Sequence, residues 1–211
     1  MIMDPDVGRL TGKDIGPGRF PEVPAIIERF DDITGNVQDL KGKRILVTAG
    51  GTREAIDPVR FIGNKSSGKQ GIAIALAARN RGAHVHLIAA NFDTSALDGI
   101  EVSKVESADD MQKVLTEQFP ACDVLIMSAA VADYTPKIKS TQKIKKNSSD
   151  LNIELTKTVD ILKSLGEQKS KQILIGFALE TENEIENAFS KLERKNADFI
   201  VLNSLNDMGA G

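Results

Sequence analysis

The chain has 211 residues, of which 41% are hydrophobic and 27% are charged, and its formal net charge is -3. These values are typical of a globular protein with one domain and some additional chain, and they argue against intrinsic disorder. Tryptophan is absent and aromatic residues make up 4%, so nothing indicates a nucleic-acid partner. We recognise neither a signal peptide nor a membrane-spanning apolar run, and therefore expect a cytoplasmic protein without a membrane partner.

Cysteine and histidine are too few to suggest a metal or disulfide framework. Cys122 is the only cysteine, and His84 and His86 alternate along an apparent strand. This excludes a cysteine-rich zinc site within one chain and makes a Ser-His-Asp arrangement improbable. We expect Cys122, just before a strand, to be a buried hydrophobic residue rather than a nucleophile. The residues identify no metal ligands.

The first 40 residues differ from the rest of the chain. Prolines and glycines recur between residues 5 and 24 and interrupt any long element, so only residues 24–30 favour a short helix. We interpret residues 1–40 as an arm or linker and residues 41–211 as the main domain.

From Lys43 onwards, apolar runs that predict strands alternate with amphipathic segments that predict helices. Buried strands are expected at residues 44–49, 84–89, 123–128, 173–177 and 198–202. Helices are expected at residues 67–81, 107–119, 160–165 and 182–195, and a short strand at 151–155. This alternation predicts an α/β fold with a mostly parallel sheet and helices on both faces.

Open parallel sheets bind their ligands outside the carboxyl ends of the strands. The segments that follow the predicted strands are rich in Gly, Ser, Lys, Asn and Asp. They are residues 50–69, 89–93, 129–146 and 177–181. We therefore expect the functional residues in these segments.

The first of these segments could bind phosphate. Gly50 and Gly51 would let backbone N–H groups approach a ligand, and Ser66, Ser67 and Gly68 open a helix whose N-terminus favours an anion. The segment matches neither the P-loop nor the dinucleotide-binding fingerprint. A helix cap beside solvated lysines explains these residues equally well, and both interpretations stay open.

The segment after the third strand begins with small residues from Ala129 onwards. They would permit close approach of a planar ligand, and Asp133 could accept hydrogen bonds from a ribose or a base. A tightly packed turn capped by Asp133 is the simpler interpretation. The basic residues 137–146 predict a solvated loop, which could instead close over a triphosphate.

Lys191 and Lys195 lie one helical turn apart beside an apolar stripe. Like charges at this spacing repel mildly unless an anion lies between them. A solvated helix edge is the default interpretation. Taken together, lysines, amides and backbone N–H groups suit chemistry by positioning and charge neutralisation, such as nucleotidyl or phosphoryl transfer.

Six stretches, in this order, resemble the phosphopantothenoylcysteine synthetase family, the second half of a bifunctional bacterial protein of coenzyme A synthesis. They are VTAGGTREAIDPVRFIGNKSSGKQG (47–71), SAAVADY (128–134), QKIKK (142–146), VDIL (159–162), GFALET (176–181) and KLERKNADFIVLN (191–203). The resemblance implies a Rossmann-like, doubly wound fold and a homodimer. It also implies ligation of 4′-phosphopantothenate and L-cysteine through an acyl-cytidylate formed from CTP.

The resemblance also assigns roles to residues. It places Lys143 at the activation step with CTP, and Asn64 at the step in which cysteine attacks the acyl-cytidylate. Together with the phosphate-suited glycines and serines, the expected nucleotide-binding residues are Gly50, Gly51, Ser66, Ser67, Gly68, Ala129, Asp133, Lys143, Val159, Asp160, Ile161, Leu162, Phe177, Lys191 and Lys195. Mg²⁺ is expected with the nucleotide, although its ligands are unknown.

Residues 8–20 resemble the flap of the partner half, an FMN-dependent decarboxylase, with Gly12 in place of its reactive cysteine. We therefore expect neither decarboxylase activity nor FMN, and regard fusion or association with a decarboxylase half as conceivable. In the family the ligase domain continues beyond the position of Gly211, so we expect this chain to lack the last C-terminal elements.

The alternative hypothesis is a nucleotide- or dinucleotide-binding module without ligase activity. Dinucleotide-binding domains usually carry an acidic residue at the end of the second strand, where it holds a ribose hydroxyl. Here that strand ends in Ala89, Ala90 and Asn91, which weakens the case for NAD.

Overall fold

The structure is a computed structural model that describes residues 5–9, 14–34, 37–95, 97–146 and 150–204. The chain divides into two compact units, Met1–Asp39 and Leu40–Gly211. The second unit contains the parallel sheet and the candidate site.

The first unit contains a hairpin and a helix. Strands β1 (Asp6–Arg9) and β2 (Ile15–Arg19) pair antiparallel, and helix α1 spans Val23–Thr34. Our expectation that only a short helix would form here was wrong. A two-stranded hairpin has edges on both sides, where proline and glycine are tolerated.

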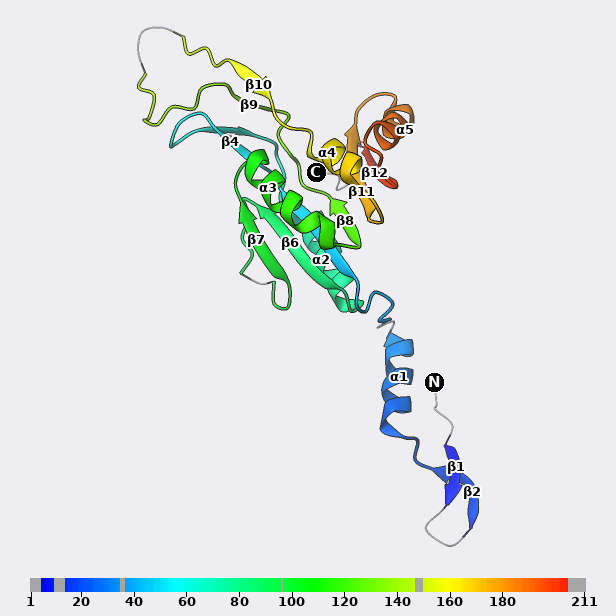
Figure 1. Cartoon of the computed structure of the whole chain (residues 1–211). Helices are drawn as coiled ribbons and strands as arrows, with labels where there is room; N and C mark the ends of the chain where they lie inside the picture. Colours follow the sequence, from blue (N-terminus) through cyan, green and yellow to red (C-terminus); the bar gives the residue numbers. More distant parts are fainter. Residues whose placement is uncertain (1–4, 10–13, 35–36, 96, 147–149, 205–211) are drawn as a thin grey trace. The chain divides into compact units, whose positions relative to one another are not determined.

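The centre of the second unit is a six-stranded parallel sheet. Its strand order is β12-β11-β8-β3-β6-β7 (Figure 1). The strands are β3 (Arg44–Gly50), β6 (His84–Ala90), β7 (Glu101–Val105), β8 (Val124–Met127), β11 (Ile173–Glu180) and β12 (Phe199–Ser204). The predicted α/β fold with a parallel sheet is confirmed.

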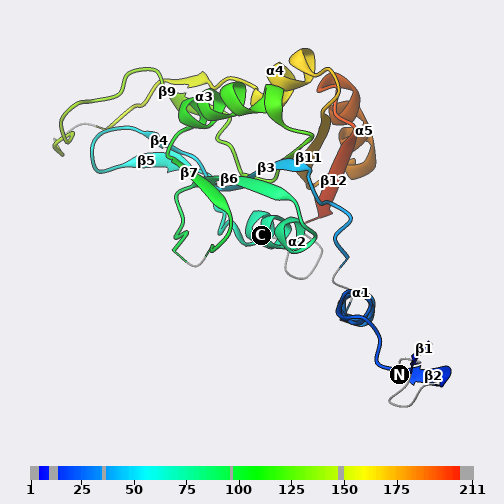
Figure 2. The same ribbon diagram turned by 60° about the horizontal axis from the view of Figure 1, so that its bottom comes forward.

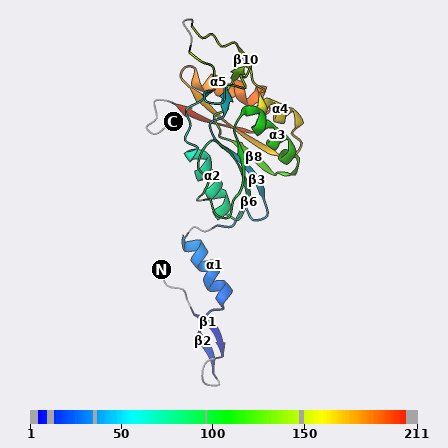
Figure 3. The same ribbon diagram turned by 90° about the vertical axis from the view of Figure 1, so that its left-hand side faces the viewer.

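Helices cover both faces of this sheet. They are α2 (Lys69–Asn80), α3 (Ala108–Gln118), α4 (Ile161–Gln168) and α5 (Glu184–Arg194), with a 3₁₀ turn at Phe119–Ala121. Figure 2 shows α2 below the sheet and α3 and α4 above it, and Figure 3 shows the same separation of α2 from α3 and α4 from the side. Two apolar clusters fill the layers, one beneath α2 and one beneath α3 and α4.

Sequence periodicity missed β7 and three of four very short strands, and it misplaced the fourth. Strand β4 (Arg53–Ala55) pairs with β5 (Phe61–Gly63), and β9 (Tyr134–Pro136) pairs with β10 (Leu155–Lys157), both antiparallel. Three residues are too few to show alternation, and β7 carries polar residues at the sheet edge. The predicted strand at 151–155 was displaced, because pairing with β9 selects residues 155–157.

Candidate functional site

A pocket of about 480 Å³ lies beyond the carboxyl end of β8 and beside β11. Its wall is formed by Met127, by residues of the segments 129–134 and 157–162, and by Phe177, Lys191 and Lys195. The location agrees with the general rule that ligands bind at this edge of a parallel sheet. We call this cavity the strand-end pocket.

The strand-end pocket collects most of the residues expected to bind a nucleotide, although they come from four separate stretches of sequence. These residues are Ala129, Asp133, Val159, Asp160, Ile161, Leu162, Phe177, Lys191 and Lys195. Apolar, anionic and cationic groups therefore face one cavity, which is suited to a ligand with a planar apolar part and a charged part.

Helix α4 begins at the pocket because Asp160 caps it. The Asp160 carboxylate accepts a hydrogen bond from the backbone N–H of Lys163 at 3.1 Å. Thr158, two residues before Asp160, connects the segment 157–162 to the segment 129–134 on the other side of the pocket. Its hydroxyl donates to the carbonyl of Ala132 at 2.6 Å, and its backbone N–H donates to the carbonyl of Asp133 at 2.9 Å. The first residues of α4 therefore lie at the pocket wall, and a helix N-terminus favours negative charge.

Two lysines of the α5 region bring positive charge to the pocket. Lys195 forms an ion pair with Asp160, and Lys191 donates to the carbonyl oxygen of Phe177 at 2.6 Å. Burial lowers the pKa of Lys191 below its ordinary value, and the neighbouring Lys195 ammonium adds to this against the opposing effect of Glu180. A bound anion would stabilise the charged form of such a partly desolvated ammonium group.

Asp160 remains ionised despite its position at the pocket wall. Burial acts to raise the pKa of its carboxyl group, but hydrogen bonds from Lys195 and from the backbone of Lys163 outweigh burial, so the pKa lies below its ordinary value. The pocket therefore holds a charged pair at neutral pH.

Buried threonines fix the backbone of the pocket floor. The hydroxyl of Thr48 accepts from the N–H of Ala129 at 3.1 Å, and that of Thr52 accepts from the N–H of Ala132 at 2.8 Å. Both threonines are fully buried. Our sequence analysis missed them; the signal was a hydroxyl residue inside an apolar run for Thr48 and directly after Gly50 and Gly51 for Thr52.

The glycine- and serine-rich residues near α2 do not line the strand-end pocket. A side chain at Gly51 would come within 2.7 Å of the carbonyl oxygen of Asn64, and Gly50 has a positive φ of 86°. Gly68, the residue before α2, also has a positive φ, and its N–H donates to the hydroxyl of Ser66 at 3.4 Å. Ser67 likewise accepts from the N–H of Lys69. Gly68, at the N-cap position of α2, provides no capping side chain, so the helix-cap interpretation and phosphate binding both stay predictions.

The two residues expected to be catalytic lie in different surroundings. Asn64 donates from its side-chain amide to the carbonyl of Val131 at 3.0 Å, and Val131 lines the pocket. Lys143 is exposed and does not line the pocket; it belongs to the loop 137–146. That segment was predicted to be a loop, and it is one.

Within the described ranges, no cluster of three or more His, Cys, Asp and Glu residues could hold a metal ion. Cys122 is 2% exposed, and burial raises the pKa of its thiol to about 11. This agrees with the expected buried hydrophobic role. No helix in the described part of the chain combines the length and apolarity needed to cross a membrane.

Fold and pocket together define a class: a Rossmann-like α/β domain with a pocket of apolar and charged residues at the carboxyl edge of its sheet. Within this class, residues 40–211 match the family model of the DNA/pantothenate metabolism flavoprotein C-terminal domain. The chain belongs to that family.

Individual relatives agree with this assignment. The chain is 44% identical over 215 residues to the coenzyme A biosynthesis bifunctional protein CoaBC of Bacillus subtilis, covering all of this chain and 52% of that protein. It is 47% identical over 217 residues to a cysteine/cysteine sulfinic acid decarboxylase of an unknown prokaryotic organism, covering all of this chain and 60% of the relative. The chain thus spans little more than half the length of these relatives.

A solved structure supports the same family. The crystal structure of the C-terminal domain of a coenzyme A biosynthesis bifunctional protein CoaBC superposes with a TM-score of 0.69 at 51% identity, covering 77% of each chain. This similarity extends the family assignment from sequence to the arrangement of the sheet and its helices.

Proposed function

We propose that the chain is a ligase domain of coenzyme A biosynthesis that joins 4′-phosphopantothenate to L-cysteine and uses CTP to activate the carboxylate. The observation that carries this proposal is the convergence of Lys191, Lys195, Asp133 and the α4 N-terminus on one pocket. The family resemblance assigns nucleotide binding to these same positions, and the Bacillus subtilis relative is named for coenzyme A biosynthesis.

The pocket lysines, together with Lys143 and Asn64 from outside the pocket wall, suit the two steps of such a reaction. In the first, the carboxylate oxygen of 4′-phosphopantothenate attacks the α-phosphorus of CTP, and pyrophosphate leaves. Lys191, Lys195 and the proposed activation residue Lys143 would neutralise the phosphates. In the second step, the cysteine amine attacks the acyl carbon, CMP leaves, and Asn64 would assist. Because no nucleophilic side chain is needed, catalysis depends on positioning and charge stabilisation.

Mg²⁺ is proposed to arrive with the nucleotide. Mg²⁺ is commonly held by one or two carboxylates together with substrate phosphates and water, rather than by a cage made only of protein. The pocket wall offers Asp133, while Asp160 is engaged with Lys195. This donor set fits a nucleotide-borne ion, which would neutralise phosphate charge when bound.

The central test is an assay of the purified chain with CTP, Mg²⁺, 4′-phosphopantothenate and cysteine. Pyrophosphate and CMP should form in equal amounts, and ATP should replace CTP poorly. Without cysteine, pyrophosphate should appear only as a burst of about one equivalent per site. A folded chain that releases no pyrophosphate would contradict the proposal.

Asn64→Asp separates the two steps. We expect a normal burst of pyrophosphate followed by accumulation of the acyl-cytidylate, because the altered side chain no longer offers its amide donor. Asn203→Asp is a matched control, since the Asn203 amide donates to the side-chain oxygen of Gln70 at 3.4 Å and Asn203 does not line the pocket. Normal product formation by Asn64→Asp would remove Asn64 from the mechanism.

The alternative, a nucleotide- or dinucleotide-binding module without ligase activity, is tested by thermal shift with CTP, ATP and NAD. Asn91, at the position where a dinucleotide domain usually carries an acidic residue, donates to the carbonyls of Gly51 and Glu106, each at 2.9 Å. That side chain is thus used structurally. Stabilisation by NAD alone would favour the alternative.

We further propose a homodimer and a functional association with a decarboxylase half, as the family resemblance implies, and the cytoplasmic location expected from the sequence. Exposed apolar residues of the first unit, such as Val7, Ile15 and Phe20, support contact with another protein surface. Gly12, on which the expected lack of decarboxylase activity rests, lies outside the described residues. Mass measurement in solution and a flavin absorbance spectrum test these points.

A further inference from the structure

The loop 137–146, which we call the lysine loop, leaves β9 and is attached to the segment that carries β4. The backbone N–H of Ser140 donates to the carbonyl of Ile56 at 2.9 Å. The Lys139 ammonium lies 3.8 Å from a carboxylate oxygen of Glu54, which is 2% exposed. These contacts hold the first half of the lysine loop.

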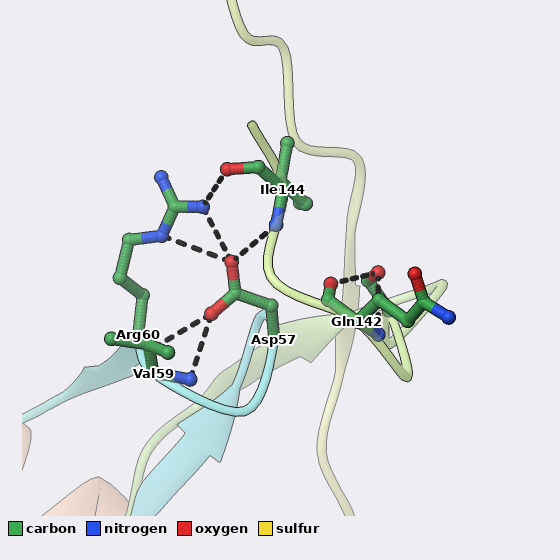
Figure 4. A network of polar contacts seen from close by, with 6 residues as sticks. Asp57, Val59, Arg60, Gln142 and Ile144 are labelled. Atoms are coloured by element: carbon green, nitrogen blue, oxygen red, sulfur yellow. Dashed lines mark hydrogen bonds and ion pairs between the residues drawn. The ribbon is translucent and has the colours of Figure 1, made fainter. Parts of the chain in front are cut away.

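The second half is held by a buried carboxylate, that of Asp57. It accepts hydrogen bonds from the backbone N–H groups of Val59 at 2.8 Å, Arg60 at 2.9 Å and Ile144 at 3.1 Å, and from Nε of Arg60 at 3.0 Å (Figure 4). The Arg60 guanidinium also donates to the carbonyl of Ile144 at 2.7 Å. Both backbone polar groups of Ile144 are therefore bound by this Asp57–Arg60 pair.

Ile144 directly follows Lys143, so the pair restrains the backbone from which the Lys143 side chain extends. Asp57 and Arg60 do not line the strand-end pocket. Their contacts with Ile144 join positions 87 and 84 apart in the sequence. A cluster that served only its own turn would need the bonds to Val59 and Arg60 but not those to Ile144.

Only a carboxylate satisfies this set of donors. An ionised carboxylate has only acceptor sites and can take a forked guanidinium together with backbone N–H groups. The guanidinium of Arg60, with the backbone donors, holds the pKa of Asp57 far below its ordinary value. One carboxylate oxygen accepts from the backbone N–H groups of Val59 and Arg60, and the other accepts from the Arg60 guanidinium and the N–H of Ile144. An asparagine would turn its NH₂ group toward one of these two sets of donors, and it would lose the negative charge in either orientation.

We propose that Asp57, acting with Arg60, is a positioning residue that fixes the lysine loop so that Lys143 is oriented for its reaction. The assignment of the reaction rests on the proposed function. The restraint itself is a property of the described contacts.

The first arm of the test is hydrogen exchange and needs no substrate. In Asp57→Asn, the Ile144 amide should exchange about tenfold faster or more than in the native chain, because it loses a charge-assisted partner. Amides of β3 should keep their native rates. Asp198→Asn is the control, since Asp198 likewise accepts from a backbone N–H, that of Leu174, at 2.7 Å, and from Lys169 at 3.0 Å. It should leave Ile144 unchanged.

The second arm is a double-mutant cycle on pyrophosphate release. Asp57→Asn should lower kcat/KM for CTP about tenfold or more while thermal unfolding shows a folded chain, and Arg60→Lys should act in the same direction because lysine cannot form the fork. If Asp57 acts through Lys143, Asp57→Asn combined with Lys143→Met should be no slower than Lys143→Met alone. Any change in kcat/KM that Asp198→Asn causes alone should instead appear in full when it is combined with Lys143→Met.

Two results would overturn the proposal: unchanged exchange at Ile144 in Asp57→Asn, or fully additive losses in the double variant. A native chain that releases no pyrophosphate would instead reject the proposed function. In that case the exchange arm alone decides whether Asp57 holds the loop.

Discussion

Lys195 and Asp160 are 35 positions apart and form an ion pair at the wall of the strand-end pocket. The same Asp160 carboxylate caps α4 through the N–H of Lys163. One side chain therefore starts a helix and orients a pocket lysine, so helix stability and pocket charge are coupled.

We expect Asp160→Asn and Asp160→Ala to separate these two roles. Asparagine retains the cap but loses the charge, which should cost under ~1 kcal/mol of unfolding free energy for a partly exposed pair. Alanine should cost about 1 kcal/mol more, because the cap is also lost. Urea unfolding measures both values.

The same residue predicts a pH dependence. Because the pKa of Asp160 is lowered in the folded chain, its stabilising contribution is present above the ordinary aspartate pKa and is lost as the pH falls through the folded-state pKa. The difference in unfolding free energy between the native chain and Asp160→Asn should therefore become smaller as the pH is lowered. A gap of constant size would contradict the ion pair.

Lys191→Met should separate ligand binding from stability. CTP binding should weaken about tenfold or more, because a charge-assisted contact is lost. The free energy of unfolding at neutral pH should stay within about 1 kcal/mol of the native value. The variant loses the hydrogen bond to Phe177, but it no longer buries a charged group. Titration calorimetry and urea unfolding provide the two values.

A pH series checks the physical cause. Burial lowers the folded-state pKa of Lys191, so the unfolded chain holds more protons between that pKa and the ordinary lysine value. Native stability should therefore rise relative to Lys191→Met across this alkaline window. If the native chain instead lost stability relative to Lys191→Met in this window, burial would not be the main cause of the pKa shift of Lys191.

Cys122 should be chemically inert in the folded chain. Its thiol is 2% exposed and has a pKa raised to about 11 by burial, so its reaction with a thiol reagent at pH 8 should be about 100-fold or more slower than that of an exposed cysteine. Urea should abolish the difference. Rapid labelling before unfolding would contradict the buried position.

Gly166→Ala should disturb the contact between α4 and the end of α5. An added Cβ would lie 1.9 Å from the carbonyl oxygen of Lys195, and overpacking of this kind costs about 1–3 kcal/mol. Displacement of Lys195 should also weaken CTP binding. Glu167→Ala, on the exposed side of the same helix, is the control and should change stability by under ~0.5 kcal/mol.

Sequence patterns were sufficient for the long elements. The mainly apolar run from Arg44 to Ala49 became the buried strand β3. The helix predicted at 107–119 became α3, which begins with a reciprocal capping box between Ser107 and Asp110. Such signals are local, because a buried strand needs an apolar run and a helix start needs a nearby acceptor.

Local sequence signals did not predict the short strands or the contacts that support the site. Asp57 stands in a turn with no periodicity, and only its contact with Ile144, 87 positions later, gives it a role in the lysine loop. Thr48 lies within an apolar run, and only the folded structure shows that its hydroxyl accepts a hydrogen bond from the N–H of Ala129.

The sequence by itself determined the alternation of strands and helices, and with it a parallel sheet and the edge at which a ligand would bind. Only the tertiary structure decided which polar residues share one pocket, and it left Lys143 and the glycines near α2 outside the wall of that pocket. The reason is that secondary structure follows interactions between near neighbours in the chain, whereas a site depends on strand order and helix crossing, which bring distant residues such as Asp160 and Lys195 together.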